Sequence, residues 1–539
     1  MRRVDRAGVD CDVLVVGAGP SGLMTSLLLG RQGVRTIVVE KRSTQSLLPR
    51  ALGINVRSME IFRSLGIAED IRRTSRDVRG LPFVVDMDTL RGPVRETVPF
   101  QASGDPGAAD SPSPEHFAFC AQNQLEPILQ ATVEQSGMCD VWSGMELVDL
   151  SQDDAGIAAL VRERSLTLER SVRANFLVAG DGAHSTVREA LGIRMRGHDH
   201  LTRELNILVD ADLTQALGAV RAVLYQVRHP WRSGTCLFRN VDGRNRWSVV
   251  CEWFDDPSPA RCTELIRLCA QDPRLAVDVL GVGEWERAAM LADRFQAGRV
   301  FLIGDAAHRV TPAGAFGMNT GIQDAHNLAW KLALVLKGRA MGGLLATYQA
   351  ERRPWTASTV DLSYRLTGQH RRAAAKTLGH VLGQAYDVGA LISDGSAPPD
   401  VQDPIAEYAP SARPGRRAPH QWVNIDGRRV STLDFFGKNF VLLSGSEAWC
   451  SASRGAAAEL GVEIDAHVIS ESGWKEFYEV GTQGAVLVRP DGHVAWRTRE
   501  PAADGPGALT EALARILEGC GTGSSKADDD RRGDVMVLV

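Results

Sequence analysis

The sequence predicts a mixed α/β and α+β protein in which a Rossmann-like nucleotide-binding domain carries an inserted β-sheet domain and precedes a separate C-terminal domain. The chain has 539 residues, several times the roughly 150 residues of an average domain. A strand, a glycine turn, a helix and a second strand open it, and strand-like runs such as 221–229 and 246–254 occupy its middle. A stretch rich in Pro, Gly and Ser at about 390–420 resembles an interdomain linker.

The chain opens with a βαβ pattern. Residues 12–16 read as an apolar strand, 21–32 as a helix that stops at Gly33, and 36–40 as a second strand. A unit of about 30 residues in this order is the context in which a GxGxxG motif indicates dinucleotide binding.

The turn of this unit contains the motif itself, as Gly17, Gly19 and Gly22. The first glycine makes the tight turn, the second lets a pyrophosphate approach, and the third lets helix and strand pack closely. Free N–H groups at the helix N-terminus would bind the phosphates, and Glu40 would accept hydrogen bonds from a ribose diol. The motif alone leaves FAD and NAD open as the dinucleotide.

A second segment, 299–340, favours FAD. It combines a buried strand at 300–303, the pair Gly304-Asp305, a loop rich in Pro and Gly, and a long helix from about residue 320. The N-terminus of that helix would stabilise negative charge on a bound group. A reduced isoalloxazine ring is such a group, and Asp305 would accept a hydrogen bond from a ribityl hydroxyl.

Composition excludes other classes. Lys and Arg total 61 and Asp and Glu total 66, a net charge of -5, which predicts no nucleic acid partner. The nine cysteines are scattered without a CxxC pair, so we expect a reducing compartment, and no residues have the spacing of a metal site. The first apolar run, 13–16, is too short for a signal peptide or a membrane span, and we expect a cytoplasmic protein with no membrane partner.

Five segments together resemble a known family. They are GAGPSG at 17–22, LVAGDGAHSTVREALGI at 177–193, the stretch that begins GDAAHRVTPAGAFGMN at 304, PRALGINVRSMEIFRSLGI at 49–67 and AQNQLEPIL at 121–129. Their order and content resemble the group A FAD-dependent monooxygenases, the family of para-hydroxybenzoate and phenol hydroxylases. The likeness is strongest to bacterial hydroxylases of aromatic polyketides such as anthracyclines and angucyclines.

The resemblance implies tightly bound FAD and a set of residues that hold it. Its members are Gly17, Gly19, Ser21 and Gly22 at the pyrophosphate, Glu40 at the adenosine ribose, Arg50 and Gln122 at the phosphate or ribityl region, Asp181 at FAD and the pyridine nucleotide, Asp305 at the ribityl chain, and Pro312, Gly317, Met318 and Asn319 beside the flavin ring. Lys41 is also expected to bind the cofactor. The usual loop pattern is PPxGGxGMN. Here Thr311 replaces the first proline and Ala315 the second glycine, which costs backbone freedom beside the flavin.

The resemblance also implies a reaction. NADPH or NADH would bind transiently and reduce the flavin, O2 would form a flavin C4a-hydroperoxide, and a polycyclic aromatic polyketide would be hydroxylated in antibiotic or secondary-metabolite biosynthesis. Tyr225 resembles a substrate-contacting tyrosine of anthracycline hydroxylases, although a half-buried strand aromatic is an equal alternative. For His308 and His326, which flank the flavin loop, packing is favoured over catalysis.

Two other functions stay open at this point. The same peroxyflavin would also serve oxidative rearrangement, such as Baeyer–Villiger insertion, ring opening or successive hydroxylations. A flavin-binding carrier or scaffold without oxygenase turnover is the alternative of another class. The sequence is compatible with either a monomer or a homodimer.

The predicted domains follow from these motifs. A discontinuous FAD-binding domain takes 1–75, 101–195 and 291–365, a substrate-binding domain 76–100 and 196–290, a helix and linker 366–419, a thioredoxin-like domain 420–522 and a flexible tail 523–539. The thioredoxin-like expectation rests on a strand at 440–443 and a hairpin that turns at 490–492. Ser453 stands where a second redox cysteine would follow Cys450, so no internal disulfide can form and a structural role is expected. Residues 101–117 predict an exposed loop.

Overall fold

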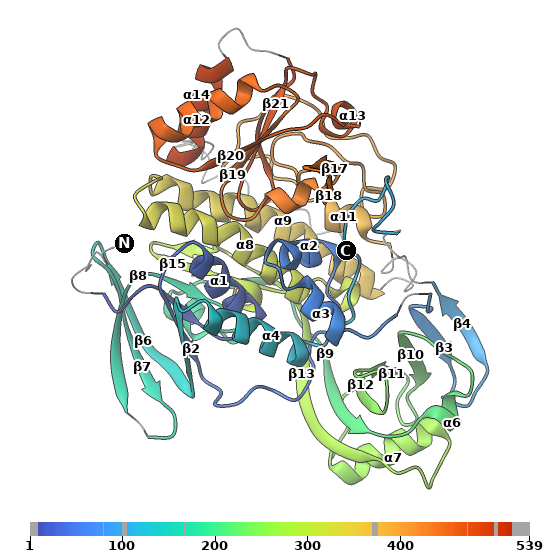
Figure 1. Ribbon diagram of the computed structural model, residues 1–539. Coiled ribbons are helices and arrows are strands. Elements are labelled where there is room, and N and C mark those ends of the chain that lie inside the picture. The colour runs from blue at the N-terminus through green and yellow to red at the C-terminus, as the bar shows by residue number, and fades with distance from the viewer. Residues whose placement is uncertain are drawn as a thin grey trace, which may run out of the picture.

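The computed structural model describes residues 9–78, 80–99, 105–166, 168–368, 376–471, 473–500 and 505–519. The predicted tail at 523–539 lies outside these residues. Figure 1 shows a central helical region, a curved sheet at the lower right and the C-terminal elements above the helices. The mixed α/β architecture with several sheets confirms the predicted fold class, whereas the domain boundaries stay predictions.

The first sheet is built on parallel strands. Strand β1 (Cys11–Val16) lies between β2 (Thr36–Glu40) and β8 (Glu169–Ala179), parallel to both. The sheet continues through β5 (Cys139–Ser143) on one side and through β15 (Val300–Leu302) and β14 (Gln296–Ala297) on the other, while β6 (Met145–Asp153) and β7 (Gly156–Glu163) form a hairpin that pairs with β8. Every residue of β1 is buried, as expected for a strand covered on both faces.

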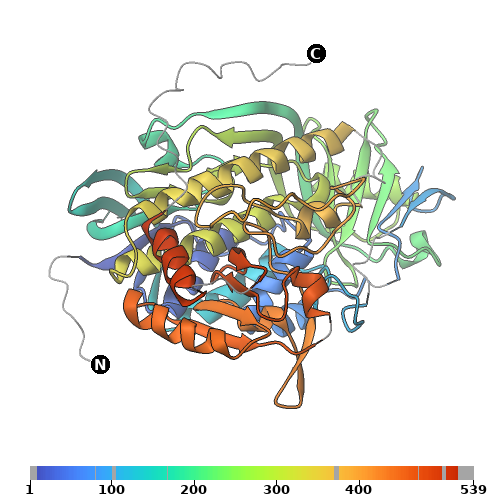
Figure 2. The same ribbon diagram turned by 90° about the horizontal axis from the view of Figure 1, so that it is seen from above.

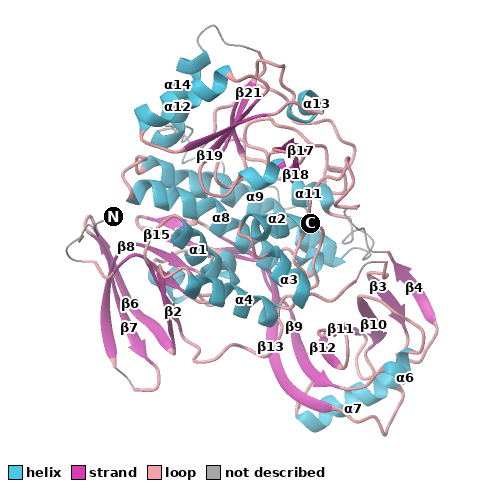
Figure 3. Ribbon diagram, viewed as in Figure 1, coloured by secondary structure: helices cyan, strands magenta, loops and turns pink. Residues whose placement is uncertain are grey.

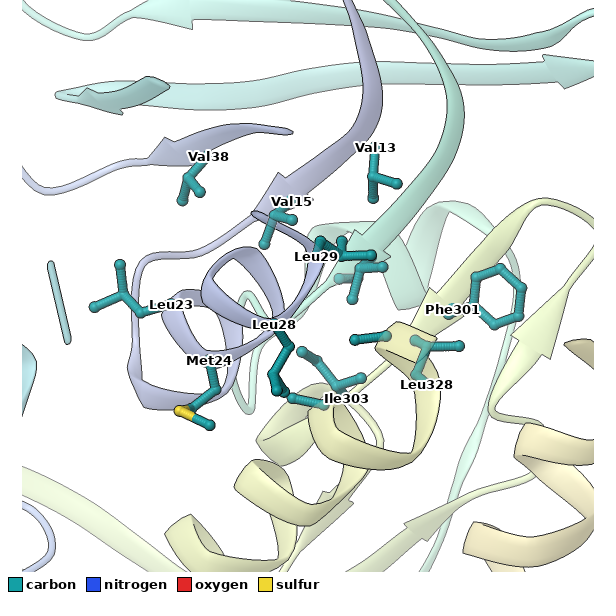
Figure 4. Close-up of a cluster of buried hydrophobic side chains, with 14 of the residues drawn as sticks. Val13, Val15, Leu23, Met24, Leu28, Leu29, Val38, Phe301, Ile303 and Leu328 are labelled. Atoms are coloured by element: carbon teal, nitrogen blue, oxygen red, sulfur yellow. The ribbon is translucent and has the colours of Figure 1, made fainter. Parts of the chain in front are cut away.

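Two long helices close one face of this sheet. Helix α1 (Pro20–Arg31) follows the glycine turn, and α8 (Gly317–Leu336) packs beside it. Figure 4 shows Leu28, Ile303 and Leu328 meeting below the strands. These side chains are at most 6% exposed, and each such burial stabilises the fold by about 1.5–3 kcal/mol. The core therefore holds α1 and α8 against the sheet.

The second sheet forms the curved region at the lower right of Figure 1. Its strand order is β16-β13-β9-β12-β11-β10-β3-β4. The strands are β3 (Val84–Met87), β4 (Val94–Val98), β9 (Met195–Asp210), β10 (Leu224–Arg228), β11 (Thr235–Asn240), β12 (Arg246–Glu252), β13 (Asp278–Ala292) and β16 (His308–Arg309). Helix α7 (Pro259–Ala270) packs on one face together with Phe238 and Val249, which leaves the other face for a site.

Shorter helices join the two sheets. They are α2 (Val56–Ser64), α3 (Ala68–Thr74), α4 (Gln122–Gln135), α5 (Thr186–Ala190), α6 (Thr214–Leu217) and α11 (Leu378–Leu382). Asn55 caps α2 by accepting the N–H of Ser58 at 2.9 Å.

Helix α9 (Gly343–Gly368) runs along α8. Among the described helices, none combines the length and apolar character that a membrane span requires.

The C-terminal part has its own mixed sheet. Strand β19 (Phe440–Ser444) is parallel to β20 (Ile464–Val468) and antiparallel to β21 (Ala485–Val488), which pairs with β22 (Val494–Thr498). Helices α12 (Ala448–Leu460), α13 (Trp474–Tyr478) and α14 (Gly505–Glu518) and the hairpin of β17 (Trp422–Ile425) and β18 (Arg428–Ser431) complete it. The predicted strand at 440–443 and the hairpin around 490–492 are confirmed.

This sheet sits directly on the flavin-motif helices. Figure 3 shows α8 and α9 between the C-terminal strands and the first sheet, and in Figure 2, seen from above, the C-terminal elements lie in front of these helices. Trp330 of α8 and Leu344 of α9 share a buried cluster with Phe440 of β19.

The exposed loop predicted at 101–117 is not exposed in its second half. Residues 101–104 lie outside the described residues, and most of 111–117 is buried. Glu115 is 1% exposed and pairs with Arg63 and Arg72, because the C-terminal part covers this segment.

Candidate functional site

A connected cavity of about 1800 Å³ lies where the two sheets and the N-terminus of α8 meet. The glycine turn after β1 and the Asp181 turn after β8 line one end. The second sheet lines the other, with apolar side chains Phe83, Leu237 and Val250. An elongated cofactor and a planar aromatic molecule would therefore share one continuous cavity.

The glycine turn is shaped by close backbone approaches. Gly17 has φ +100°, and a Cβ there would strike the carbonyl oxygen of Gly180. A Cβ on Gly22 would strike the carbonyl oxygen of Gly17, so Gly22 packs behind the cavity wall. A Cβ on Gly19 would meet nothing within 4 Å, because that position opens to the cavity. Helix α1 begins there without a side-chain cap, which leaves its N–H groups for a phosphate.

Glu40 and Asp181 place carboxylates at this end. Glu40 accepts the N–H groups of Ala18 and Arg42, each at 2.9 Å, which fixes its orientation. Asp181 Oδ2 accepts the N–H of Val187 at 3.2 Å, while its buried Oδ1 has no hydrogen-bond partner among the described residues. Burial raises the pKa of Asp181. An acceptor left in this state suits a hydroxyl of a bound dinucleotide.

The turn that holds Asp305 is anchored from below. Asp305 is exposed to the cavity, next to Gly304 with φ +56°. The N–H of Gly304 donates to Asp324 Oδ2 at 3.1 Å, and Asp324 is held in turn by His308 at 2.7 Å and Arg352 at 2.8 Å. His308 is thus buried and holds the Asp324 carboxylate in place, as the packing interpretation predicted.

The N-terminus of α8 also points into the cavity. Phe316 precedes it without a side-chain cap, and Gly317 and Met318 line the wall. Asn319 lies behind them, where its Nδ2 donates to the carbonyls of Gly53 at 3.0 Å and Ala315 at 2.7 Å. The free amides at this end are placed to stabilise negative charge on a flavin ring.

The structure brings most of the predicted cofactor residues to one cavity. Its lining includes Gly17, Gly19, Ser21, Glu40, Lys41, Arg50, Gln122, Asp181, Asp305, Pro312, Gly317 and Met318. Gly22 and Asn319 support the wall from behind. The cradle at Gly19, the orphaned acceptor of Asp181 and the uncapped helix ends fit FAD.

Tyr225 is not brought to the cavity. Its ring is 3% exposed and packs edge-on against Trp247, and its hydroxyl accepts the N–H of Ala222 at 3.0 Å. The neighbouring Leu224 lines the cavity instead, because alternate residues of a strand face opposite sides. Tyr225 therefore packs as an aromatic side chain of the strand, which was the alternative to a substrate-contacting tyrosine.

His326 is likewise remote from the cavity lining. It is 8% exposed on α8, and burial lowers its pKa to about 3. It is neutral at physiological pH and packs toward the C-terminal part, beside Arg57 and Asp491. Packing thus describes this histidine too.

The second sheet contributes polar residues that sequence reasoning missed. Glu204, Asn206, Arg239 and Arg287 line the cavity from β9, β11 and β13. None belongs to a motif, and their orientation depends on strand register, which the sequence did not define. Alternation along β11 was the available signal, since Cys236 and Phe238 face α7 and Arg239 faces the cavity.

One buried cluster resembles a set of metal ligands. His229, Cys236 and Cys251 bring ligand atoms within 4.8 Å of one another. However, His229 Nδ1 accepts the N–H of Trp231 at 3.1 Å. That ring nitrogen is therefore occupied by a backbone hydrogen bond and is not free to bind a metal.

The fold and this cavity define a flavin-binding oxidoreductase. Residues 10–363 match the family described as FAD binding domain, and 411–519 match the family described as Aromatic-ring hydroxylase, C-terminal. The chain belongs to the FAD binding domain family of aromatic-ring monooxygenases and is a flavoprotein monooxygenase with FAD as its cofactor.

Individual relatives cover nearly the whole chain. Aklavinone 12-hydroxylase of Streptomyces purpurascens is 38% identical over 94% of this chain and 99% of its own. Tetracenomycin B2 monooxygenase-dioxygenase of Streptomyces olivaceus is 36% identical over 94% and 99%. Among solved structures, a ternary complex of aklavinone-11 hydroxylase with FAD and aklavinone has a TM-score of 0.85 at 36% identity and covers 95% of this chain and 99% of its own.

Proposed function

We propose that this chain hydroxylates a polycyclic aromatic polyketide, using NADPH or NADH and O2, in the biosynthesis of an antibiotic or other secondary metabolite. The observation that carries the proposal is the continuity of the cavity from the glycine turn to the apolar wall of the second sheet. Relatives that act on aklavinone and tetracenomycin by name support the substrate class. A flavin-binding carrier without turnover has no support among these relatives.

The side chains divide the work in the cavity. Residues at the N-termini of α1 and α8, with Glu40, Asp181 and Asp305, would hold FAD. When bound and reduced, FAD activates O2 for transfer of one oxygen atom to an electron-rich ring. Phe83, Phe117, Leu237 and Val250 would cover the planar substrate and exclude water from the reacting atoms.

We also propose roles for the second sheet and for the C-terminal part. The second sheet would be the substrate-binding domain, and residues 420–522 would form a thioredoxin-like domain with a structural role. Cys450 supports that role, since burial and the charge of Glu447 raise the pKa of its thiol and disfavour the reactive thiolate.

Substrate-stimulated oxidation of NADPH tests the proposal. Holoenzyme supplied with polycyclic phenols and O2 should oxidise NADPH faster than holoenzyme alone and form a hydroxylated product. If no plausible polyphenol stimulates oxidation or yields a product, the proposed function is wrong. Retention of yellow cofactor by itself decides nothing about turnover.

Oxidative rearrangement is a second candidate, favoured by the relative named monooxygenase-dioxygenase. It would use the same cavity with the substrate turned so that a carbonyl or a second ring carbon meets the oxidant. Product structure separates the two. A ring-opened, lactone or multiply oxygenated product favours rearrangement, and a single new phenol favours hydroxylation.

A further inference from the structure

Arg239 is the centre of a polar network on the cavity face of the second sheet. Its Nη2 donates to Ser248 Oγ and, at 3.5 Å, to Asn206 Oδ1. Ser248 Oγ donates to Asn206 Oδ1 at 2.6 Å, and Asn206 Nδ2 donates to the carbonyl of Pro49 at 2.8 Å. Three adjacent strands and the segment before α2 therefore hold the guanidinium in one position.

The charge of Arg239 lacks a close partner. In the part of the chain that the structure describes, no carboxylate oxygen lies within 4.0 Å of its nitrogens. The other arginines on this wall have one: Arg203 pairs with Glu284, Arg287 with Glu204, and Arg309 with Asp199 at 2.8 Å. Lys41 and Arg50, at the cofactor end, are exposed to solvent. Arg239 is thus a partly buried cation on the cavity face of the second sheet that no carboxylate among the described residues pairs with.

The surroundings of the Arg239 guanidinium favour a bound anion. The Nε of Arg239 is buried without a hydrogen-bond partner among the described residues. Burial lowers the pKa of Arg239 to about 10, while the charge of Glu204 opposes that shift, so the side chain stays protonated at neutral pH. A partly buried guanidinium without a paired carboxylate is unfavourable, and Arg239 lines the cavity, from which an anion could reach it.

We propose that Arg239 binds an oxyanion of the aromatic substrate, such as an ionised phenol or a ring carboxylate. The proposal rests on the proposed function, since it places the substrate against the second sheet. Guanidinium and oxyanion form charge-assisted hydrogen bonds, and an adjacent positive charge favours the ionised form of a phenol. A phenolate ring is more electron-rich than a phenol ring, so the same contact that positions the substrate would also activate it.

Glu204 acts on Arg239 through its charge but is not its ion-pair partner. It lies on β9 beside Asn206 and is paired with Arg287, so the Glu204–Arg287 pair is close to neutral. Ser248 and Asn206 are uncharged. The net positive charge of the wall is therefore centred on Arg239, and one substrate oxyanion would neutralise it.

Titration of a bound dye tests the proposal without turnover. The probe is 1,2-dihydroxyanthraquinone, whose visible absorbance changes when a phenol ionises. Bound to oxidised holoenzyme, its phenol should have a pKa about 1–3 units below the value in water. Arg239→Gln should abolish most of that shift, and Arg239→Lys should retain part of it. Flavin absorbance reports whether each variant is folded.

Matched probes and a control variant define the outcomes. Arg221 lies outside the cavity lining and donates to the carbonyls of Gly218 and Val220, so Arg221→Gln should behave as the unmodified enzyme. The dye with both phenols methylated should bind alike to Arg239→Gln and the parent. Anthraquinone-2-carboxylate, which has no phenol, should lose affinity about tenfold or more in Arg239→Gln if a carboxylate is the oxyanion recognised, corresponding to about 1.4 kcal/mol or more.

An unchanged phenol pKa and unchanged carboxylate affinity in flavin-loaded Arg239→Gln would overturn the proposal. That failure is distinct from failure of the proposed function. If Arg239→Gln hydroxylates polyphenols with the parent kcat and KM, the function stands and the Arg239 site is wrong. If the parent shifts the dye pKa through Arg239 but oxygenates nothing, the site stands and the function is wrong.

Discussion

At the scale of single residues, two departures from the usual flavin loop have opposite structural consequences. Ala315 adopts φ +55° where the family pattern has glycine, a conformation that costs an L-residue about 1–2 kcal/mol. Thr311 replaces a proline, yet its hydroxyl donates to the carbonyl of Ser363 at 2.8 Å and its N–H to Ser363 Oγ at 3.3 Å. The second bond requires the N–H that proline lacks. The loop is thus tied to α9 while keeping one strained residue beside α8.

Gly19→Val is predicted to abolish flavin binding with little loss of stability. A Cβ added at Gly19 would point into open cavity space, so valine would occupy the room that a pyrophosphate needs. The purified variant should lack the yellow flavin absorbance. Gly455→Val is the control. A Cβ added at Gly455 would also meet open space, but Gly455 lies on the exposed face of α12. Full flavin occupancy in Gly19→Val would refute the assignment of the pyrophosphate site.

How far single residues were predictable depended on whether a backbone motif defines them. Gly17 and Gly22 are required by backbone clashes that any sequence with this turn must avoid, and so the pattern revealed them. Tyr225 and Arg239 lie on strands of the second sheet, where register decides which side chains face the cavity. A shift of one position exchanges Tyr225 for Leu224, and no local pattern predicted that choice.

At the scale of elements, local patterns located the helices and strands around the cofactor. The helix expected at 21–32 spans Pro20–Arg31, and the long helix expected from about 320 begins at Gly317. The lengths of β9 and β13 were not predicted. Their pairing is interrupted by register shifts between Val279 and Gly281 and between Arg287 and Ala289, and such irregularities depend on the partner strand.

The C-terminal sheet is predicted to take no part in electron transfer. Cys450 and Ser453 lie on α12, where Ser453 Oγ donates to the carbonyl of Cys450 at 2.9 Å. Cys450→Ser should therefore leave substrate-dependent NADPH oxidation and the yield of product unchanged. A loss of more than about tenfold with normal flavin content would instead assign chemistry to this thiol.

At the scale of the whole molecule, buried charges join the C-terminal part to the flavin-motif helices. Glu351 of α9 accepts Arg489 at 2.8 Å, Lys331 of α8 at 2.8 Å and the N–H of Ala390 at 2.7 Å. Arg489 also pairs with Asp491 in the turn between β21 and β22. A second link joins Arg417 to Glu60 of α2. These contacts set the position of α8, whose N-terminus faces the cavity.

Glu351→Gln is predicted to destabilise the protein by about 3–5 kcal/mol, because Arg489 and Lys331 would remain buried without their carboxylate. Burial raises the pKa of Glu351, but the charges of Arg489 and Lys331 outweigh burial and lower this pKa from 4.5 to about 2. The stabilisation is therefore fully present above pH 4.5 and is lost as the pH falls toward 2. Urea unfolding at neutral and acidic pH measures both effects.

The control for this prediction is Glu459→Gln, on the exposed face of α12, which should change stability by less than about 0.5 kcal/mol. Equal stability of Glu351→Gln and the parent at neutral pH would show that the buried network does not hold the C-terminal part in place.

Isotopically labelled O2 shows whether one cavity holds both FAD and an aromatic polyketide for oxygen transfer. Holoenzyme with NADPH and a polycyclic phenol should incorporate labelled oxygen into the ring of the product, and flavin-free Gly19→Val should incorporate none. Flavin-loaded enzyme that consumes NADPH with such substrates but yields only unlabelled substrate and hydrogen peroxide would contradict oxygen transfer in this cavity.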